Sequence, residues 1–333
     1  MTSIAGLSLN AVRRQFDRRA LRAADADFLH REIEQRMFER LDLVRINPSR
    51  ILDAGCGYGA GLRTLGERYP QALVVGADLS PATAGVAGRL AHSTAHPTAD
   101  RVTRTHSPNP DGLVRGWLGR MGAAFGVGSS QAPTAATAST VTGGSPAEPR
   151  ACVISADTQA LPLANARFDL VWSNLALHWC PDPGLALAEW SRVLRADGLL
   201  MFSAYGVDTL RELRALGWTT QRFPDLHDLG EALIRTGFSA PVMDMEPIQL
   251  TWTDPWKAWS DLRALGGNAL EARGRGLRGR SCQQRWLDQL AQARDASGAI
   301  SVTIELVYGH AWCAPASKLE RGTARIEFVR PAR

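Results

Sequence analysis

Two spacings of apolar residues run along this chain, and each predicts one kind of element. Between Phe28 and Leu43 apolar side chains recur every fourth residue with charged side chains between them, which predicts an amphipathic helix. Shorter apolar runs without that spacing predict buried strands separated by helical segments. The expected strands cover 50–53, 72–79, 152–157, 168–174 and 198–205, and the expected helices begin near 59 or cover 81–90 and 184–195. Strands that alternate with helices in this way are typical of a parallel sheet with helices on both faces.

The C-terminal part continues with expected helices over 208–216 and 225–235. Two late strands are expected over 241–252 and 301–312, on either side of a helical, arginine-rich segment. The order of elements predicts an α/β fold with a doubly wound sheet and a C-terminal helical elaboration. Five late tryptophans are expected to pack in a core rather than form a ligand cage: Trp252, Trp256, Trp259, Trp286 and Trp312.

Residues 91–150 differ in composition from the rest of the chain. They are rich in Ala, Thr, Ser, Gly and Pro and poor in charge, which predicts a largely disordered insertion. Within it, Leu113, Trp117, Met121 and Phe125 follow one another at intervals of four and predict one amphipathic helix. That helix is expected either to dock on the domain surface or to serve as a mobile lid or partner-binding helix.

Composition and charge narrow the class of protein further. The chain of 333 residues has a net charge of +5, which is too small to indicate nucleic-acid binding by itself. It contains no run of eighteen apolar residues, so neither a transmembrane helix nor membrane contact is expected. The N-terminus lacks the apolar core of a secretion signal, and we expect a cytoplasmic protein. Five scattered cysteines favour reduced thiols over a metal site or a disulfide framework.

The stretch ILDAGCGYGAG, residues 51–61, places glycines directly after an expected strand that ends in an acidic residue. Its spacing fits the dinucleotide fingerprint, and S-adenosylmethionine is the alternative ligand. Asp53 favours the second ligand, because a poorly solvated carboxylate repels a pyrophosphate and attracts an ammonium and a sulfonium. Asp78, at the end of the next strand, is placed to bind a ribose in either case. The glycines would let the backbone approach the ligand closely.

Four motifs occur in the order found in class I S-adenosylmethionine-dependent methyltransferases, and the chain resembles that class. They are DAGCG from Asp53, DLSP from Asp78, Asp157 after a strand, and FDLVWSNLALHW from Phe168. The resemblance implies a Rossmann-like, seven-stranded methyltransferase sheet, S-adenosylmethionine as co-substrate and no metal. It implies cofactor-binding roles for these residues: Asp53, Gly55 and Gly57 with Cys56 between them at the methionine part, Asp78 with Leu79 beside it at the ribose, Asp157 and Thr158 at the adenine, and Asn174 and Leu175 under the methyl group.

Segments outside these motifs resemble the malonyl-acyl-carrier-protein O-methyltransferases of biotin synthesis. VRRQFDRRA, LRALGGNALEARGRGLRGR and ELVYGHAW carry this likeness, which covers most of the chain outside 91–150. It implies methyl transfer to the free carboxylate of a malonyl thioester, an early step of pimeloyl and biotin synthesis. Both a carrier-protein-bound and a coenzyme-A-bound malonyl group fit this expectation. The family commonly has an aromatic residue where this chain has Ala23, so one lid contact to the cofactor is expected to be missing or replaced.

The expected reaction needs no general base. Carboxyl groups titrate at roughly 3 to 5, so a malonyl carboxylate is ionised near neutral pH and can attack a sulfonium methyl group directly. The protein would align the reactants and exclude water. The candidates to position the carboxylate lie near strand ends or in the N-terminal lid: Arg18, His178, Tyr205 and Arg211.

An acidic acyl carrier protein is the expected partner. Arginine suits phosphate and carboxylate docking, and the arginine-rich segment supplies candidates for it: Arg273, Arg275, Arg278 and Arg280. The alternatives are an enzyme that modifies a protein partner or another small acid, and a non-catalytic scaffold that binds S-adenosylmethionine. No nucleic acid is expected as a partner, because no pattern of stacking aromatics accompanies the arginines.

These expectations divide the chain into parts. They are an N-terminal helical lid over 1–45, a Rossmann-like cofactor-binding domain over 46–90 and 151–252, the insertion over 91–150, a helical, arginine-rich elaboration for substrate and carrier docking over 253–300, a last sheet strand over 301–317 and a tail over 318–333.

Overall fold

The computed structural model describes residues 7–20, 28–91, 151–265 and 279–314. All of these residues belong to one compact unit, made of Met1–Ser93 and Glu148–Arg333. The expected insertion, apart from its first residue, lies outside the described residues, and so does its amphipathic helix.

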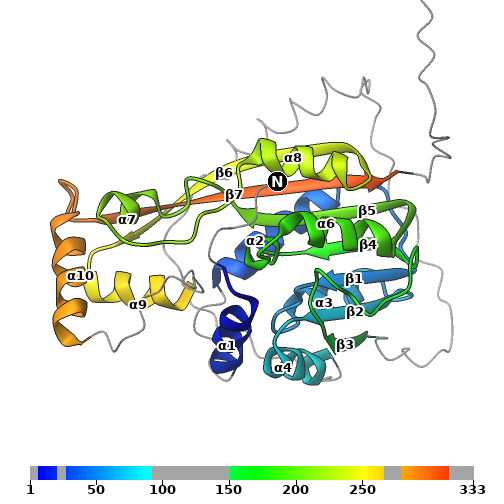
Figure 1. Ribbon diagram of the computed structural model, residues 1–333, viewed down its shortest axis with the longest axis horizontal. Helices are drawn as coiled ribbons and strands as arrows, with labels where there is room; N and C mark the ends of the chain where they lie inside the picture. Colours follow the sequence, from blue (N-terminus) through cyan, green and yellow to red (C-terminus); the bar gives the residue numbers. More distant parts are fainter. Residues whose placement is uncertain (1–6, 21–27, 92–150, 266–278, 315–333) are drawn as a thin grey trace, which may run out of the picture. The chain divides into compact units, whose positions relative to one another are not determined.

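The core of this unit is a seven-stranded sheet with the order β3-β2-β1-β4-β5-β7-β6, which confirms the predicted α/β fold (Figure 1). Strands β1 to β5 pair in parallel, and β7 is antiparallel to both of its neighbours, β5 and β6. Each strand overlaps one of the apolar runs from which it was predicted. The strands are β1 (Arg50–Ala54), β2 (Leu73–Asp78), β3 (Ala151–Ser155), β4 (Phe168–Ser173), β5 (Leu194–Tyr205), β6 (Phe238–Trp252) and β7 (Ile300–Cys313).

Helices cover both faces of the sheet, because successive side chains of a buried strand point to opposite faces. Ile51 and Leu52 are neighbours in β1 but belong to two different apolar clusters, the first with α2 and α3 and the second with α6 and α8. Among the described helices, none is both long and apolar enough to cross a membrane. The helices are α1 (Leu9–Arg19), α2 (Phe28–Leu41), α3 (Ala60–Arg68), α4 (Pro81–Ala91), the short η2 (Leu177–Trp179), α6 (Pro183–Val193), α7 (Arg211–Ala215), α8 (Leu226–Arg235), α9 (Pro255–Leu265) and α10 (Arg280–Gln292).

The helix expected over 208–216 is shorter in the structure, where α7 begins only at Arg211. The backbone N–H of Asp208 donates a hydrogen bond to the carboxylate of Glu305 in β7 at 2.6 Å. Leu210 adopts a left-handed conformation with φ 61°. The bond to β7 holds the residues before α7 in a turn, so the predicted start of this helix was wrong.

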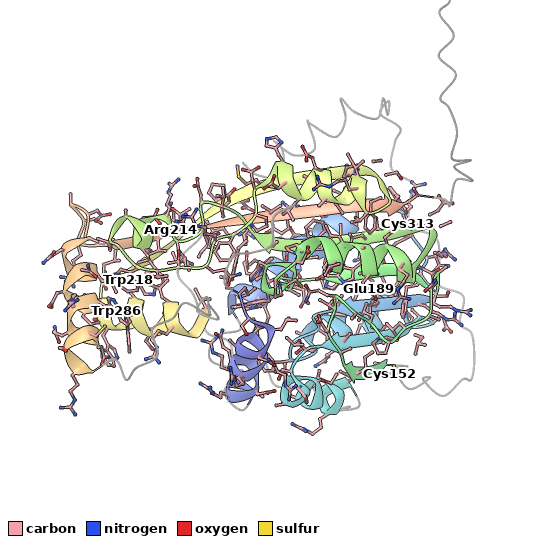
Figure 2. All side chains as sticks on the ribbon, in the orientation of Figure 1. Cys152, Glu189, Arg214, Trp218, Trp286 and Cys313 are labelled. Carbon is pink, nitrogen blue, oxygen red and sulfur yellow. The ribbon has the colours of Figure 1, made fainter. Side chains whose placement is uncertain are left out.

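Strands β6 and β7 continue beyond the end of β5 as a two-stranded ribbon. The last residue of β5, Tyr205, pairs with Leu306, whereas β7 pairs with β6 as far back as Ile300. This ribbon supports α7, α9 and α10, which share one apolar cluster with it (Figure 1). Trp218 and Trp286 lie in this part of the molecule (Figure 2).

The buried carboxylate of Asp169 ties the beginning of β4 to the beginning of β1. It accepts hydrogen bonds from the backbone N–H groups of Ser49 and Arg50 at 2.6 and 2.8 Å, and it pairs with Arg195 at 2.7 Å. Burial alone would raise the pKa of Asp169, but the hydrogen bonds and the Arg195 charge outweigh burial and lower it. This carboxylate therefore stabilises the N-terminal edge of the parallel strands.

Candidate active site

A cleft of about 1140 Å³ opens where the parallel strands end. Residues at the C-terminal ends of β1, β2 and β4 line it, and the strand order changes direction between β1 and β4. Open parallel sheets bind ligands at such a switch point. Helices α1, α2, α9 and α10 supply the other walls. A pocket for one small molecule measures roughly 300–1,000 Å³, so this cleft has room for more than one ligand.

The loop after β1 brings bare backbone to the cleft. Gly55 has φ +82°, and a Cβ built on it would lie 2.2 Å from the Cβ of Ala176, so a larger residue does not fit. Gly57 has φ +51°, and apart from its own atoms and its two neighbours in the chain no atom of the described residues lies within 4 Å of a Cβ built there. Its backbone N–H donates a hydrogen bond to Asp78 at 3.1 Å. The loop thus leaves open space beside an oriented carboxylate.

Three carboxylates line one end of the cleft: Asp53 near the end of β1, Asp78 at the end of β2, and Glu34 from α2. A Cβ built on Gly61 would lie 2.9 Å from Asp53 Oδ2 and 2.7 Å from Glu34 Oε1, so these two carboxylates converge. Burial, and then the charges of Glu34 and Asp78, raise the pKa of Asp53 well above its usual value. This end of the cleft, which we call the acidic end, is suited to a cation.

Asp78 is oriented by two backbone donors, Gly57 N–H at 3.1 Å and Ser80 N–H at 2.9 Å. Burial raises its pKa to about 6, with the two hydrogen bonds acting to lower the pKa and the charge of Asp17 acting to raise it. The Ser80 hydroxyl donates to Asp17 at 2.6 Å, which fastens α1 beside the end of β2. At neutral pH the Asp78 carboxylate is mainly ionised and can accept hydrogen bonds from a ligand.

The predicted adenine-binding residues line the cleft, but both already have partners within the protein. Asp157 accepts hydrogen bonds from the backbone and side chain of Gln159 at 2.9 and 3.2 Å, so it stabilises a turn. The Thr158 hydroxyl accepts a hydrogen bond from Trp190 at 2.7 Å. A ligand at this position would share these carboxylate and hydroxyl groups with the protein.

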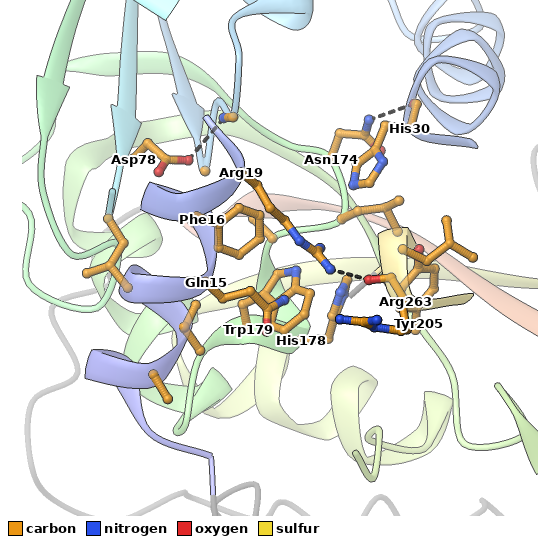
Figure 3. Close-up of a pocket in the computed structure, with 18 of the residues that line it drawn as sticks. Gln15, Phe16, Arg19, His30, Asp78, Asn174, His178, Trp179, Tyr205 and Arg263 are labelled. Carbon is orange, nitrogen blue, oxygen red and sulfur yellow. Dashed lines mark hydrogen bonds between the residues drawn. The ribbon is translucent and has the colours of Figure 1, made fainter. Parts of the chain in front are cut away.

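Asn174 joins the end of β4 to α2. Its Nδ2 donates to the backbone carbonyl of His30 at 3.0 Å, and its Oδ1 accepts from the Ser203 hydroxyl at 2.8 Å (Figure 3). Leu175, next in the chain, has φ 52° and is buried on the cleft wall. Two more predicted cofactor residues also line the cleft: Cys56 and Leu79.

His178 and Tyr205, both predicted to position the substrate carboxylate, lie together on the cleft wall with ring centroids 4.4 Å apart. Neither ring nitrogen of His178 nor the Tyr205 hydroxyl has a hydrogen-bond partner among the described residues. Burial, and then the charge of His30, lower the pKa of His178 to about 3, and burial raises the pKa of Tyr205. The imidazole is therefore neutral near pH 7 and a weak base, and these groups are available to a ligand.

The two arginines predicted to hold the carboxylate are placed differently. Arg18 lines the cleft, although it is exposed. Arg211 does not line the cleft, because its guanidinium pairs with Asp208 at 3.3 Å and Glu212 at 3.2 Å. The structure thus does not bring Arg211 to the site.

Sequence-based reasoning missed Arg19, the last residue of α1, which is half-buried and lines the cleft. Arg19 lies seven residues after Val12 and three after Phe16, so the three residues share one face of the helix. Val12 is buried, and the Phe16 ring packs edge-on against Trp179 with centroids 5.3 Å apart. The helical spacing was the signal that could have identified Arg19, since Arg18 points about 100° away from it.

The cleft continues between residues 217–220, α9 and α10, and we call this part the tryptophan arm. Trp218, Trp259 and Trp286 line it. The Trp259 indole N–H and the Thr220 hydroxyl also line it, and both are buried without a hydrogen-bond partner among the described residues. Trp256 is 53% exposed, so its predicted place in a core was wrong.

Two further predictions concern residues that are largely outside the described part of the chain. Arg273, Arg275 and Arg278 lie outside it, and so does Ala23. Arg280 is described: it is the first residue of α10, and it is exposed.

Comparison with known proteins identifies the class. A family model described as "Methyltransferase domain" matches residues 109–202. The fold is similar to that of the YcgJ protein of Bacillus subtilis, with a TM-score of 0.50 and 14% sequence identity over 85% of this chain and 99% of that one. The sheet and the matched domain define a class I methyltransferase.

Two curated relatives narrow the identification. The malonyl-[acyl-carrier protein] O-methyltransferase of Laribacter hongkongensis is 39% identical over 341 residues, which cover 98% of each chain. The protein of the same name from a Methylovorus species is 39% identical over 329 residues, or 95% of this chain and 93% of that one. The chain therefore belongs to the malonyl-[acyl-carrier protein] O-methyltransferase family, which confirms the resemblance of its motifs.

Proposed function

We propose that this enzyme transfers a methyl group from S-adenosylmethionine to the free carboxylate of a malonyl thioester on an acyl carrier protein, an early step of pimeloyl and biotin synthesis. The observation that carries the proposal is the polarity of the cleft. Asp53, Glu34 and Asp78 line one end, whereas Arg19 and the neutral His178 line the part beyond it. A cationic donor and an anionic acceptor would each meet complementary groups.

The acidic end suits the donor. S-adenosylmethionine carries an ammonium, a sulfonium and two ribose hydroxyls, and it supplies an electrophilic methyl group. Asp53 and Glu34 would attract the positive charges, and Asp78 would accept hydrogen bonds from the hydroxyls. The open space beside Gly57 would admit the ligand close to the backbone. Asp157, Thr158, Asn174 and Leu175, with Cys56 and Leu79, complete the proposed donor site.

The transfer needs alignment rather than proton movement. One oxygen of the malonyl carboxylate forms a bond to the methyl carbon, and the electrons of the carbon–sulfur bond stay on sulfur. The carboxylate is already ionised near neutral pH, so no proton has to be removed. A neutral His178 and a protonated Tyr205 would serve as hydrogen-bond donors that orient the acceptor. Burial of the two rings would also keep water away from the reacting atoms.

The proposal is tested by the intact mass of malonyl-acyl-carrier protein after incubation with the enzyme and S-adenosylmethionine. We expect a gain of one methyl group on the malonyl form and none on the acetyl form. Absence of a gain, with donor binding established separately by calorimetry, would reject malonyl-acyl-carrier protein as acceptor and turn the search to other acids.

The tryptophan arm offers a path for the linear pantetheine tether of the acceptor. The tether contains two amides, and the Thr220 hydroxyl and the Trp259 indole N–H are unpaired polar groups in that arm. Thr220→Val preserves the shape and removes the hydroxyl. We expect KM for malonyl-pantetheine to rise by roughly 3- to 10-fold, the worth of one hydrogen bond. Malonyl N-acetylcysteamine, which lacks most of the tether, is the control, and an equal rise for both acceptors would contradict this path.

We also propose that the acidic carrier protein docks on the arginines beside α10. Support comes from the net charge of +5 and from the exposed position of Arg280. Arg273, Arg275 and Arg278 shortly precede Arg280 in the sequence, and we propose them as further docking residues. Arginine binds carboxylates and phosphates through a fixed fork of donors, so docking should weaken as salt concentration rises.

A further inference from the structure

Two arginines contact each other in the cleft. Arg19 ends α1, Arg263 lies near the end of α9, and both residues line the cleft (Figure 3). The Arg19 guanidinium donates a hydrogen bond to the backbone carbonyl of Arg263. Burial lowers the pKa of Arg19, and the charge of Arg263 lowers it further, although Tyr58 acts in the opposite direction. The two positive charges are therefore close enough to repel each other.

Neither guanidinium pairs with a carboxylate among the described residues. Arg36 of α2 shows the contrast, because it pairs with Glu32 and with Glu246 of β6. Arg19 is half-buried and Arg263 is exposed. Two like charges held close together repel each other, and an anion bound between them relieves the repulsion. A protein that places Arg19 and Arg263 together without an acidic partner therefore offers a site for an anionic ligand.

Both guanidinium groups are held in position without that ligand. The Arg263 guanidinium carbon lies 4.5 Å from the centroid of the Trp259 ring, a cation–π contact. Arg19 is fixed by its bond to the Arg263 carbonyl. Each group still has N–H donors to offer, because a guanidinium carries five. A carboxylate that binds both would gain charge-assisted hydrogen bonds in a preorganised site.

The residues around Arg19 and Arg263 suit the acceptor half of the proposed reaction. Asp78 and Arg263 lie on opposite sides of Arg19 in the view of Figure 3, with His178 and Tyr205 near Arg263. In that view the side chains of His178 and Tyr205, which carry unpaired polar groups, lie on the side of Arg19 away from Asp78. Trp259 contacts the Arg263 guanidinium and also lines the tryptophan arm, so the arm begins beside Arg263.

We propose that Arg19 and Arg263 together bind the free carboxylate of the acyl acceptor and select malonyl over monocarboxylic acyl groups. The inference rests on the proposed function and adds the residues that recognise the acceptor. The pair holds one carboxylate oxygen while the other attacks the methyl carbon. The thioester end extends into the tryptophan arm. An acetyl group has no carboxylate for the pair, so it gains nothing from this site.

The contact between Arg19 and Arg263 could instead serve only to hold α1 against α9, and the test must separate the two roles. Binding of malonyl-coenzyme A and of acetyl-coenzyme A is measured by calorimetry with S-adenosylhomocysteine present, which prevents turnover. The variants are Arg19→Gln and Arg263→Gln. The matched control is Arg13→Gln, because Arg13 lies on the same helix, is 53% exposed and does not line the cleft.

We expect the wild-type enzyme to prefer malonyl- over acetyl-coenzyme A, and each glutamine variant to lose roughly 10- to 100-fold of malonyl affinity with acetyl affinity unchanged. Arg13→Gln should keep the preference, and Arg19→Lys should restore part of it. Unchanged affinity for S-adenosylhomocysteine shows that the variants are folded.

Three outcomes would overturn the inference. Equal losses of malonyl and acetyl affinity would reduce the pair to a structural contact. An unchanged preference in both variants would exclude it from acceptor binding, and loss of the preference in Arg18→Gln alone would favour the arginine predicted from the sequence. If the wild-type enzyme methylates malonyl-acyl-carrier protein in any of these cases, only the arginine assignment fails. A wild-type enzyme without preference or activity would remove the proposed function as well.

Discussion

Asp78→Asn should reduce the affinity for S-adenosylmethionine by roughly a hundredfold or more. The carboxylate is fixed at the end of β2 by the N–H groups of Gly57 and Ser80, and in the proposed donor site it would accept hydrogen bonds from both ribose hydroxyls. Each charge-assisted bond contributes about 1.5–3 kcal/mol, and the amide offers one neutral acceptor in place of two charged ones. Titration calorimetry with S-adenosylhomocysteine measures the loss without catalysis.

The same carboxylate should make donor binding depend on pH. The pKa of Asp78 is raised to about 6 by burial, and in the proposed donor site the ribose hydroxyls would bind the ionised form. Wild-type affinity should therefore fall as the pH drops below about 6, and Asp78→Asn should lack that part of the fall. Two other carboxylates are relevant to the pH dependence: Asp53, whose own pKa is raised, and Asp17, whose charge raises the pKa of Asp78. Asp17→Asn is the comparison, because Asp17 does not line the cleft but its charge raises the pKa of Asp78. This variant should keep the fall in affinity and move it to lower pH. Full affinity in Asp78→Asn would show that the ribose binds elsewhere.

The sheet could be predicted from the sequence because its signals are local. Apolar runs such as FDLVWS in β4 are buried along their whole length, and a strand buried on both faces needs little information beyond its own composition. The start of α7 was predicted wrongly because Asp208 is held by Glu305, which lies 97 residues further along the chain. A sequence pattern carries no trace of such a bond.

The residues of the candidate site, too, could be predicted from the sequence only in part. Asp53 and Asp78 lie at or near the C-terminal ends of their strands, so their place at the cleft could be inferred from the motif itself. Glu34, Arg19 and Arg263 come from helices that reach the cleft only through tertiary packing. Glu34 follows Ile33, which belongs to the apolar stripe of α2, and both residues are buried. An acidic residue beside this stripe was the signal that could have identified Glu34. The apolar stripe predicted the helix, but it did not indicate which ligand the acid faces.

Asp53→Asn should change stability and donor affinity in opposite directions. Asp53 is 3% exposed, and its folded-state pKa is raised well above the unfolded value, so its charge opposes folding at neutral pH. The wild-type enzyme loses stability as the pH rises from the unfolded pKa towards the folded pKa, and asparagine removes that loss. The melting temperature of the ligand-free variant at pH 7 should therefore rise, by about 2–4 °C for each kcal/mol regained. Affinity for S-adenosylmethionine should fall roughly 10- to 100-fold, because the acidic end loses a charge that attracts the donor.

Asp169→Asn supplies the matched comparison on the neighbouring strand. Asp169 is also buried, but Ser49, Arg50 and Arg195 lower its pKa. Its charge therefore stabilises the folded protein above the unfolded pKa, and this stability is lost as the pH falls through the folded pKa. Its replacement should reduce the free energy of unfolding at pH 7 by about 2–4 kcal/mol and so lower the melting temperature. Donor affinity should stay unchanged, because Asp169 lies at the opposite end of the strands from the cleft. Thermal unfolding and calorimetry on both variants separate the two effects. A lower melting temperature in Asp53→Asn would mean that its carboxylate is a structural group like that of Asp169. A higher melting temperature together with weaker donor binding would identify a charge that destabilises the free enzyme and is compensated when the cationic donor binds.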